Sequence, residues 1–121
     1  MLDIEIARSH AESWIDAWNR HDLDAIMDHY ADDIELRSPY IARLLNQPDG
    51  IIRGKEAVRA YFVRGLQANP FLHFELLHVL YGVDSLTIFF RRETGAYAAE
   101  WTMLDASGKS ASVRAQYDLP P

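Results

Sequence analysis

The segment Trp18-Asn19-Arg20-His21-Asp22-Leu23-Asp24-Ala25-Ile26 decides how the fold begins. Before it, apolar residues recur at helical spacing over residues 4–18, so we expect one amphipathic helix there. Residues 19–21 interrupt this pattern and end the helix. Asp22 is a residue type that caps helix N-termini, so a second short helix follows at once. The inner face of that second helix is expected to carry Ala25, Ile26 and Tyr30.

Downstream of this junction the pattern changes to one strand, a third helix and then a run of strands. Residues 34–38 alternate apolar and polar side chains, which is typical of a half-buried strand, and Pro39 stops it. Residues 40–53 combine turn formers with many apolar side chains, so we expect this loop to fold over another part of the molecule. A third helix is predicted over residues 54–69. Short turns separate four further strands, which indicates an antiparallel meander over residues 71–80, 86–92, 96–104 and 110–117.

This order of elements predicts an α+β fold, a cone-shaped barrel in which three N-terminal helices pack on a curved, mainly antiparallel sheet. The chain has 121 residues and a hydrophobic fraction of 49%, which are the size and composition of one globular domain. We expect this domain to span residues 1–118 and residues 119–121 to form a free tail.

Composition excludes several classes of function. The chain has no cysteine, which excludes disulfides, thiolate metal ligands and cysteine nucleophiles. Its 12 basic and 18 acidic residues give a net charge of -6, which disfavours binding to a nucleic-acid backbone. Acidic residues occupy the N-terminal segment, where a signal peptide has a basic stretch, and no apolar run approaches the roughly 18 residues of a membrane span. We therefore expect a cytoplasmic protein with neither nucleic-acid nor membrane partners.

Metal and nucleophile chemistry also lack support in the sequence. His73 and His78 are five residues apart on one expected strand, so they point to opposite faces and cannot share a metal ion. The five histidines show no ligand spacing of the HExxH kind. Ser38 lies outside any GxSxG context. We expect neither a metal site nor a cofactor.

One carboxylate is unusual in its surroundings. Glu100 lies in the middle of an expected strand, and its face of that strand is shared with small or mild side chains at Ala98, Thr102 and Leu104. Such neighbours leave room for a cavity in which desolvation would make the carboxyl a candidate acid or base. The other interpretation is a rim carboxylate that pairs with an arginine of a neighbouring strand. The sequence leaves both open.

Several motifs resemble those of the nuclear transport factor 2-like superfamily. They are the segment at residues 18–26, then Tyr30-Ala31-Asp32-Asp33-Ile34, then Arg37-Ser38-Pro39, and finally Gly54-Lys55-Glu56-Ala57-Val58. Within the superfamily the chain is most similar to ketosteroid isomerases and SnoaL-like polyketide cyclases, over residues 11–117. This resemblance implies a cone that encloses an apolar pocket. It also implies homodimers that pair through the convex sheet face, where Tyr97, Trp101 and Met103 would lie.

The resemblance transfers only part of a catalytic site. The tyrosine of the isomerases falls on Trp14, their aspartate base falls on Ser38, and their protonated acid falls on Glu100. A serine hydroxyl does not abstract a proton at neutral pH unaided, and an indole offers one N–H donor of different reach. We therefore expect the double-bond isomerisation of ketosteroids to be absent or very weak.

The leading hypothesis is a protein that binds a small apolar carbonyl compound and acts as an isomerase, cyclase or lyase, without a cofactor. Glu100 would be the acid or base, and Ser38 and Trp14 would position the substrate oxygen. The alternative hypothesis is a non-catalytic ligand-binding protein or dimeric interaction module with the same fold. The expected ligand-binding residues are Trp14, Trp18, Tyr30, Tyr61, Phe62, Val113 and Tyr117, with His73 and Glu75 as second-tier candidates.

Overall fold

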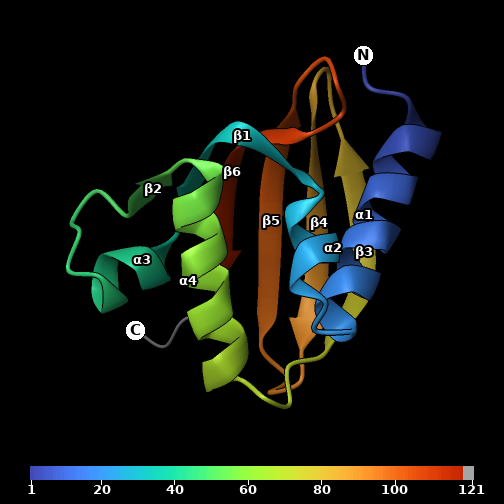
Figure 1. Ribbon diagram of the computed structural model, residues 1–121. Coiled ribbons are helices and arrows are strands. Elements are labelled where there is room, and N and C mark those ends of the chain that lie inside the picture. Colours follow the sequence, from blue (N-terminus) through green and yellow to red (C-terminus); the bar gives the residue numbers. More distant parts are fainter. Residues whose placement is uncertain (119–121) are drawn as a thin grey trace.

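The computed structural model describes residues 1–118, and the expected free tail at residues 119–121 lies outside the described residues. The chain forms an α+β fold in which a curved, six-stranded sheet carries its helices on one face (Figure 1). The strand order in the sheet is β2-β1-β6-β5-β4-β3. The elements are α1 (Ile4–Asn19), α2 (Leu23–Met27), β1 (Tyr30–Arg37), α3 (Pro39–Leu44), β2 (Ile51–Arg53), α4 (Lys55–Ala68), β3 (Phe74–Tyr81), β4 (Ser85–Arg92), β5 (Tyr97–Leu104) and β6 (Ser110–Tyr117).

Polar side chains of residues 18–26 connect the C-terminal end of α1 to the start of β3. The side-chain amide of Asn19 donates to Phe74 O at 2.9 Å and accepts from Phe74 N at 2.7 Å. His21 Nε2 lies 2.8 Å from Leu72 O, and Asp22 caps α2 by accepting from Ala25 N at 3.1 Å. The segment that ends the first helix in the sequence therefore also fixes where this helix lies against the sheet.

The segment between β1 and α4 contains more structure than its sequence predicts. Residues 40–53 were expected to be a loop, but they hold most of the short helix α3 and the three-residue strand β2, which pairs antiparallel with β1. The Ser38 hydroxyl caps α3, and Pro39 occupies its first turn, where the missing N–H costs nothing. The proline thus ends the strand and begins a helix, so the expectation that it only stops the strand was incomplete.

Tyr30 was expected on the inner face of the second helix, and this placement was wrong. The helix ends at Met27, and Tyr30 is the first residue of β1. The strand starts four residues earlier than its alternating pattern indicates, and its pairing with β6 is irregular between Tyr30 and Glu35. Strand β1 pairs with β6 in parallel, whereas β3, β4, β5 and β6 form the expected antiparallel meander.

The concave face of the sheet packs against the helices to form the core. Along β5 the side chains alternate between buried and half-buried, and Ala98, Glu100, Thr102 and Leu104 point inward. The fully buried apolar side chains come from helices and strands alike, and include Ile26, Ile34, Ile41, Val58, Leu86, Ile88 and Val113. None of the helices within residues 1–118 has the length and apolarity needed to cross a bilayer.

His10 on α1 packs against His29, which follows the C-terminal end of α2. The rings of His10 and His29 meet edge to face with centroids 5.1 Å apart, and His29 Nδ1 lies 2.9 Å from Ala25 O. Burial, with the nearby charges of His29 and Lys109, lowers the pKa of His10 from 6.5 to about 4. Burial also lowers the pKa of His29. Both rings are therefore neutral in the folded protein at neutral pH.

We expect this pair to make the fold sensitive to acid. Below pH 6.5 the unfolded chain binds a proton at His10 that the folded chain binds only near pH 4, so the free energy of unfolding falls across this interval. At about 1.4 kcal/mol per unit of pKa, His10 contributes up to roughly 3 kcal/mol to this fall. Urea unfolding between pH 4 and pH 7 should show a flatter dependence for His10→Gln than for the wild type. The exposed His73 provides the control, and an equal flattening in His73→Gln would contradict the assignment.

Candidate functional site

A cavity of about 460 Å³ lies between the concave face of the sheet and helices α1, α3 and α4. It opens between α3 and the C-terminal half of α4, because the lining residues there, Leu44, Arg64 and Ala68, are exposed. The strands β1, β4, β5 and β6 form its floor. A volume of this size accommodates a small organic molecule.

Aromatic side chains form one wall of the cavity. Trp14 stacks on Phe74 with ring centroids 5.7 Å apart and is tilted against Phe90 at 5.4 Å. Trp18 meets Phe62 edge to face at 4.9 Å. Such pairs each contribute roughly 0.5–1.5 kcal/mol beyond the area they bury, so this wall is well packed without a ligand. The cavity therefore presents a firm apolar surface to any molecule that enters.

Glu100 lies on the floor of this cavity and is 6% exposed. Its neighbours in the sheet are Ile88 on β4 and Ala115 on β6, which bring no charge. Removal from water raises the pKa of the carboxyl from 4.5 to about 8. Within residues 1–118 it forms no ion pair, because Arg91 is bonded to Tyr97 and Arg92 to Glu93. The interpretation in which an arginine of a neighbouring strand neutralises this acid does not match the structure.

Two consecutive hydrogen bonds hold the Glu100 carboxyl through Tyr30, which is not part of the cavity lining. Trp14 Nε1 donates to Tyr30 Oη at 2.9 Å, and Tyr30 Oη donates to Glu100 Oε2 at 3.1 Å. Burial and the neighbouring carboxylate raise the pKa of the Tyr30 phenol, so it remains a donor at every physiological pH. No other hydrogen bond to the Glu100 side chain is present in the described part of the chain. One carboxyl oxygen is therefore fixed, and the other has no hydrogen-bond partner within residues 1–118.

These two hydrogen bonds change the role expected for Trp14. The indole N–H was expected to position a substrate oxygen, but it is already bonded to Tyr30. Tyr30 itself lies behind Glu100 rather than on the cavity surface. Both residues therefore orient the carboxyl, and Trp14 presents only its ring to the cavity.

Ser38 lies in a group of hydroxyls at the α3 side of the cavity. It is buried, and its Oγ accepts from Tyr40 N at 3.2 Å at the start of α3. Its hydroxyl also interacts with the phenols of Tyr61 and Tyr117, whose pKa values are raised by burial and lowered somewhat by this contact. The rings of Tyr40 and Tyr117 meet at 4.6 Å. The arrangement offers neutral O–H donors and contains no group that could activate Ser38 as a nucleophile.

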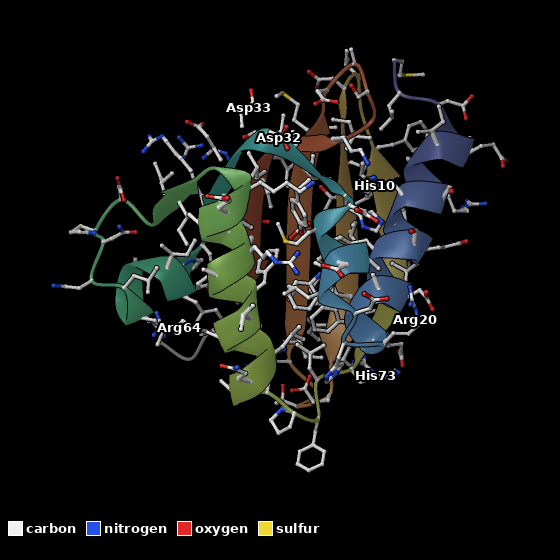
Figure 2. The ribbon with its side chains drawn as sticks, viewed as in Figure 1. His10, Arg20, Asp32, Asp33, Arg64 and His73 are labelled. Atoms are coloured by element: carbon white, nitrogen blue, oxygen red, sulfur yellow. The ribbon has the colours of Figure 1, made fainter. Side chains whose placement is uncertain are left out.

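The structure brings most of the candidate residues to one place. Trp14, Trp18, Ser38, Tyr61, Phe62, Glu100 and Tyr117 all line the cavity. Val113 is fully buried and does not reach it. His73 and Glu75 are exposed and lie outside the lining, and Figure 2 shows His73 at the lower edge of the molecule, below α1.

Two arginines of the lining were not among the residues expected from the sequence. Arg64 comes from α4, and Arg92 is the last residue of β4. The sequence pattern does indicate that Arg92 points inward. Leu86, Ile88 and Phe90 alternate inward along β4, and Arg92 continues the same face. For Arg64 the helical pattern predicts only a polar position.

Residues 1–118 contain no group of three or more histidine, aspartate or glutamate side chains placed to hold a metal ion. The polar side chains of the cavity lining supply one carboxyl group, several hydroxyls, two guanidinium groups and the amide of Asn69.

The chain resembles known proteins both in sequence and in structure. The family model of the SnoaL-like domain matches residues 11–117. A SnoaL-like protein of unknown function from Burkholderia thailandensis is 40% identical, with a TM-score of 0.94 over 98% of this chain and 100% of that one. No curated protein matches the sequence.

Two more distant structures show the same fold. A protein from Agrobacterium tumefaciens assigned to the isomerases of the SnoaL-like family is 16% identical, with a TM-score of 0.76 over 96% of this chain and 100% of that one. A Mycobacterium tuberculosis protein in complex with estradiol-17β-hemisuccinate is 20% identical, with a TM-score of 0.72 over 94% of this chain and 95% of that one.

The hydrogen bond from Tyr30 favours the ionised form of Glu100 and so lowers its pKa, against the larger effect of burial. We expect Tyr30→Phe to move the midpoint of the Glu100 titration above the wild-type value of about 8. Carbon-13 NMR of the labelled glutamate carboxyls, recorded against pH, measures both midpoints. Tyr61→Phe removes a cavity phenol that does not touch Glu100 and should leave the midpoint in place. A midpoint that falls in Tyr30→Phe would contradict the geometry.

Proposed function

Since the chain belongs to the SnoaL-like domain family, we propose that it binds a small apolar carbonyl compound in the cavity and acts on it as an isomerase, cyclase or lyase, with Glu100 as the acid/base. The observation that carries this proposal is a carboxyl group with a pKa of about 8 on the floor of an apolar cavity. A group that titrates near the working pH is the most effective proton shuttle, since both of its forms are available.

The geometry favours Glu100 as the base. The ionised carboxylate removes a proton from the carbon next to the substrate carbonyl, and the resulting enolate carries its charge on oxygen. Ser38, Tyr61 and Tyr117 offer O–H donors to that oxygen, which is how an oxyanion is stabilised in a water-poor site. The protonated Glu100 then returns the proton to another carbon of the same substrate. Tyr30 and Trp14 hold the carboxyl in place throughout.

The ligand class is supported by the shape and lining of the cavity. Eight aromatic side chains line it, and five of them carry no hydroxyl, namely Trp14, Trp18, Phe62, Phe74 and Phe90. The fold neighbour from Mycobacterium tuberculosis is in complex with estradiol-17β-hemisuccinate. These observations support a largely apolar ligand with ring character for this protein.

The lining also supports the alternative function. Among the lining residues, Glu100 is the only carboxyl group, and no histidine accompanies it. A single acid/base suffices for a reaction in which the same proton is removed and returned, but not for one that needs separate groups. A protein that only binds its ligand would have no need of a second group, so non-catalytic binding is the second candidate.

We expect the protein to catalyse the exchange of the α-protons of β-tetralone, a small apolar ketone, for deuterium. General acid–base catalysis contributes about 10²–10⁴-fold, so Glu100→Gln should lose at least tenfold of the wild-type rate. The wild-type rate above the buffer background should rise with pH through about 8, because the carboxylate is the active form. Proton NMR in deuterated buffer measures the exchange.

The control for this experiment is Glu75→Gln, which removes an exposed carboxylate and should keep the wild-type rate. If β-tetralone binds and the wild type exchanges its protons no faster than Glu100→Gln, catalysis at this acid is refuted and the binding function remains.

We also propose that two copies of the chain pair through the convex face of the sheet. All helices lie on the other face (Figure 1), which leaves β3, β4, β5 and β6 uncovered. On this convex face Tyr97 stacks on Phe89 with centroids 5.6 Å apart, and Trp101 and Met103 follow on the same side of β5. A continuous aromatic surface of this kind is more typical of an interface than of a face in contact with water.

Trp101→Arg should shift the protein from dimer to monomer, because it places a charge in the centre of the proposed interface. Sedimentation velocity at micromolar concentration measures the mass. Val83→Arg introduces the same charge at an exposed turn outside this face and should leave the dimer intact. A wild-type protein that sediments as a monomer would refute the pairing.

A further inference from the structure

The cavity has a cationic side that the proposed reaction does not use. Arg92 continues the inward face of β4, and its side chain is 17% exposed. Arg64 lies at the opening, and Figure 2 shows it on the side of α4 that faces α3. Burial raises the pKa values of the cavity phenols Tyr61 and Tyr117, and the nearby charges of Arg64 and Arg92 oppose this rise with smaller effects. Positive charge therefore acts on the cavity from two elements.

No acid of the lining balances these charges, and the one ion pair of Arg92 in the described residues is with Glu93, which lies outside the lining. Glu100 is the single carboxyl group among the lining residues, and with a pKa of about 8 it is mostly neutral at pH 7. The whole chain, by contrast, has a net charge of -6. A cationic cavity in an acidic protein is a feature of this site rather than of the protein's general composition.

Arg92 is only partly satisfied by the protein. A guanidinium has five N–H donors, and within residues 1–118 the side chain of Arg92 makes one hydrogen bond, from Nη2 to Glu93 Oε2 at 3.3 Å. Its Nε is buried without an acceptor in this part of the chain. A half-paired guanidinium in a buried position is costly, and an anionic ligand group would offset that cost.

The strand register sets the separation between the acid and the arginine. Glu100 lies opposite Ile88, and Arg92 lies four residues further along the same strand. At about 3.3 Å per residue, its backbone is about 13 Å from that of Ile88. Phe90 lies between the two positions on β4, and Phe74, opposite Arg92 on β3, packs against it with ring centroids 4.4 Å apart. A ligand that reaches both ends must be elongated and apolar in the middle.

We propose that the substrate of this cavity is an apolar carbonyl compound that carries an anionic group, such as a carboxylate, at the end remote from the reacting carbonyl. Arg92 binds the anionic group, and Arg64 at the opening attracts it. The carbonyl lies at the Glu100 end. The nature of the reacting group rests on the proposed function, but the preference for an anion rests on Arg92 and Arg64 alone.

The test uses two fluorescent probes of similar shape, anilinonaphthalene sulfonate and its uncharged parent phenylnaphthylamine. Fluorescence titration gives the dissociation constant of each probe for the wild type and the variants. Arg92→Gln should weaken binding of the sulfonate by about tenfold or more and change that of the neutral probe by less than threefold. Arg91→Gln, the matched control on the convex face, should change neither. Arg64→Gln, at an exposed position, should keep the fold and weaken binding of the sulfonate alone by roughly threefold.

The outcomes separate this proposal from the proposed function. An equal loss for both probes in Arg92→Gln, or no loss for the sulfonate in either cavity variant, overturns the anion preference and leaves the apolar pocket. A wild-type protein that binds neither probe overturns both proposals. Selective loss of the sulfonate supports the anion preference even if β-tetralone exchange fails, because this measurement does not depend on turnover.

Discussion

The hydrogen bond from Tyr30 Oη to Glu100 Oε2 joins parts of the chain that are seventy residues apart. Trp14 extends it to α1, so one carboxyl group on β5 is held by side chains of a helix and of the first strand. Burial of this carboxyl group as an anion would cost free energy. Its pKa is accordingly raised to about 8, so the group stays mostly neutral below that pH. The same burial that makes this acid costly also makes it useful as a proton shuttle, because it places both forms within reach of neutral pH.

Local pattern was enough to predict the frame of this molecule and the position of its acid. The helical spacing of Ala7, Ala11 and Trp14 predicted α1, and an isolated carboxylate among small residues on an apolar strand marked Glu100. Tyr30 was assigned to the wrong element because β1 begins shortly after α2. The helical and strand patterns overlap there, and neither is long enough to show which element contains Tyr30. The short elements α3 and β2 escaped detection because each is stabilised by its neighbours rather than by its own sequence.

Contacts between distant segments were beyond such reasoning. The bond between Asn19 and the backbone of Phe74 depends on how α1 lies across β3, which no local pattern encodes. The basic side of the cavity has the same origin, since Arg64 and Arg92 come together only when α4 covers the sheet. The resemblance to a superfamily predicted the architecture correctly, while the roles of Trp14 and Ser38 depended on their hydrogen-bond partners in this chain.

The parallel pairing of β1 with β6 has a consequence for how the molecule assembles. Strand β6 forms a hairpin with β5, so Ala115 and Tyr117 lie beside β5 through local pairing, but the cavity floor is complete only when β6 also pairs with the distant strand β1. Pairing between segments so far apart in sequence closes a long loop, which slows folding. Helices and hairpins depend on local contacts, whereas the complete cavity depends on this long-range pairing. A ligand that binds there therefore selects fully folded molecules over every partly folded form.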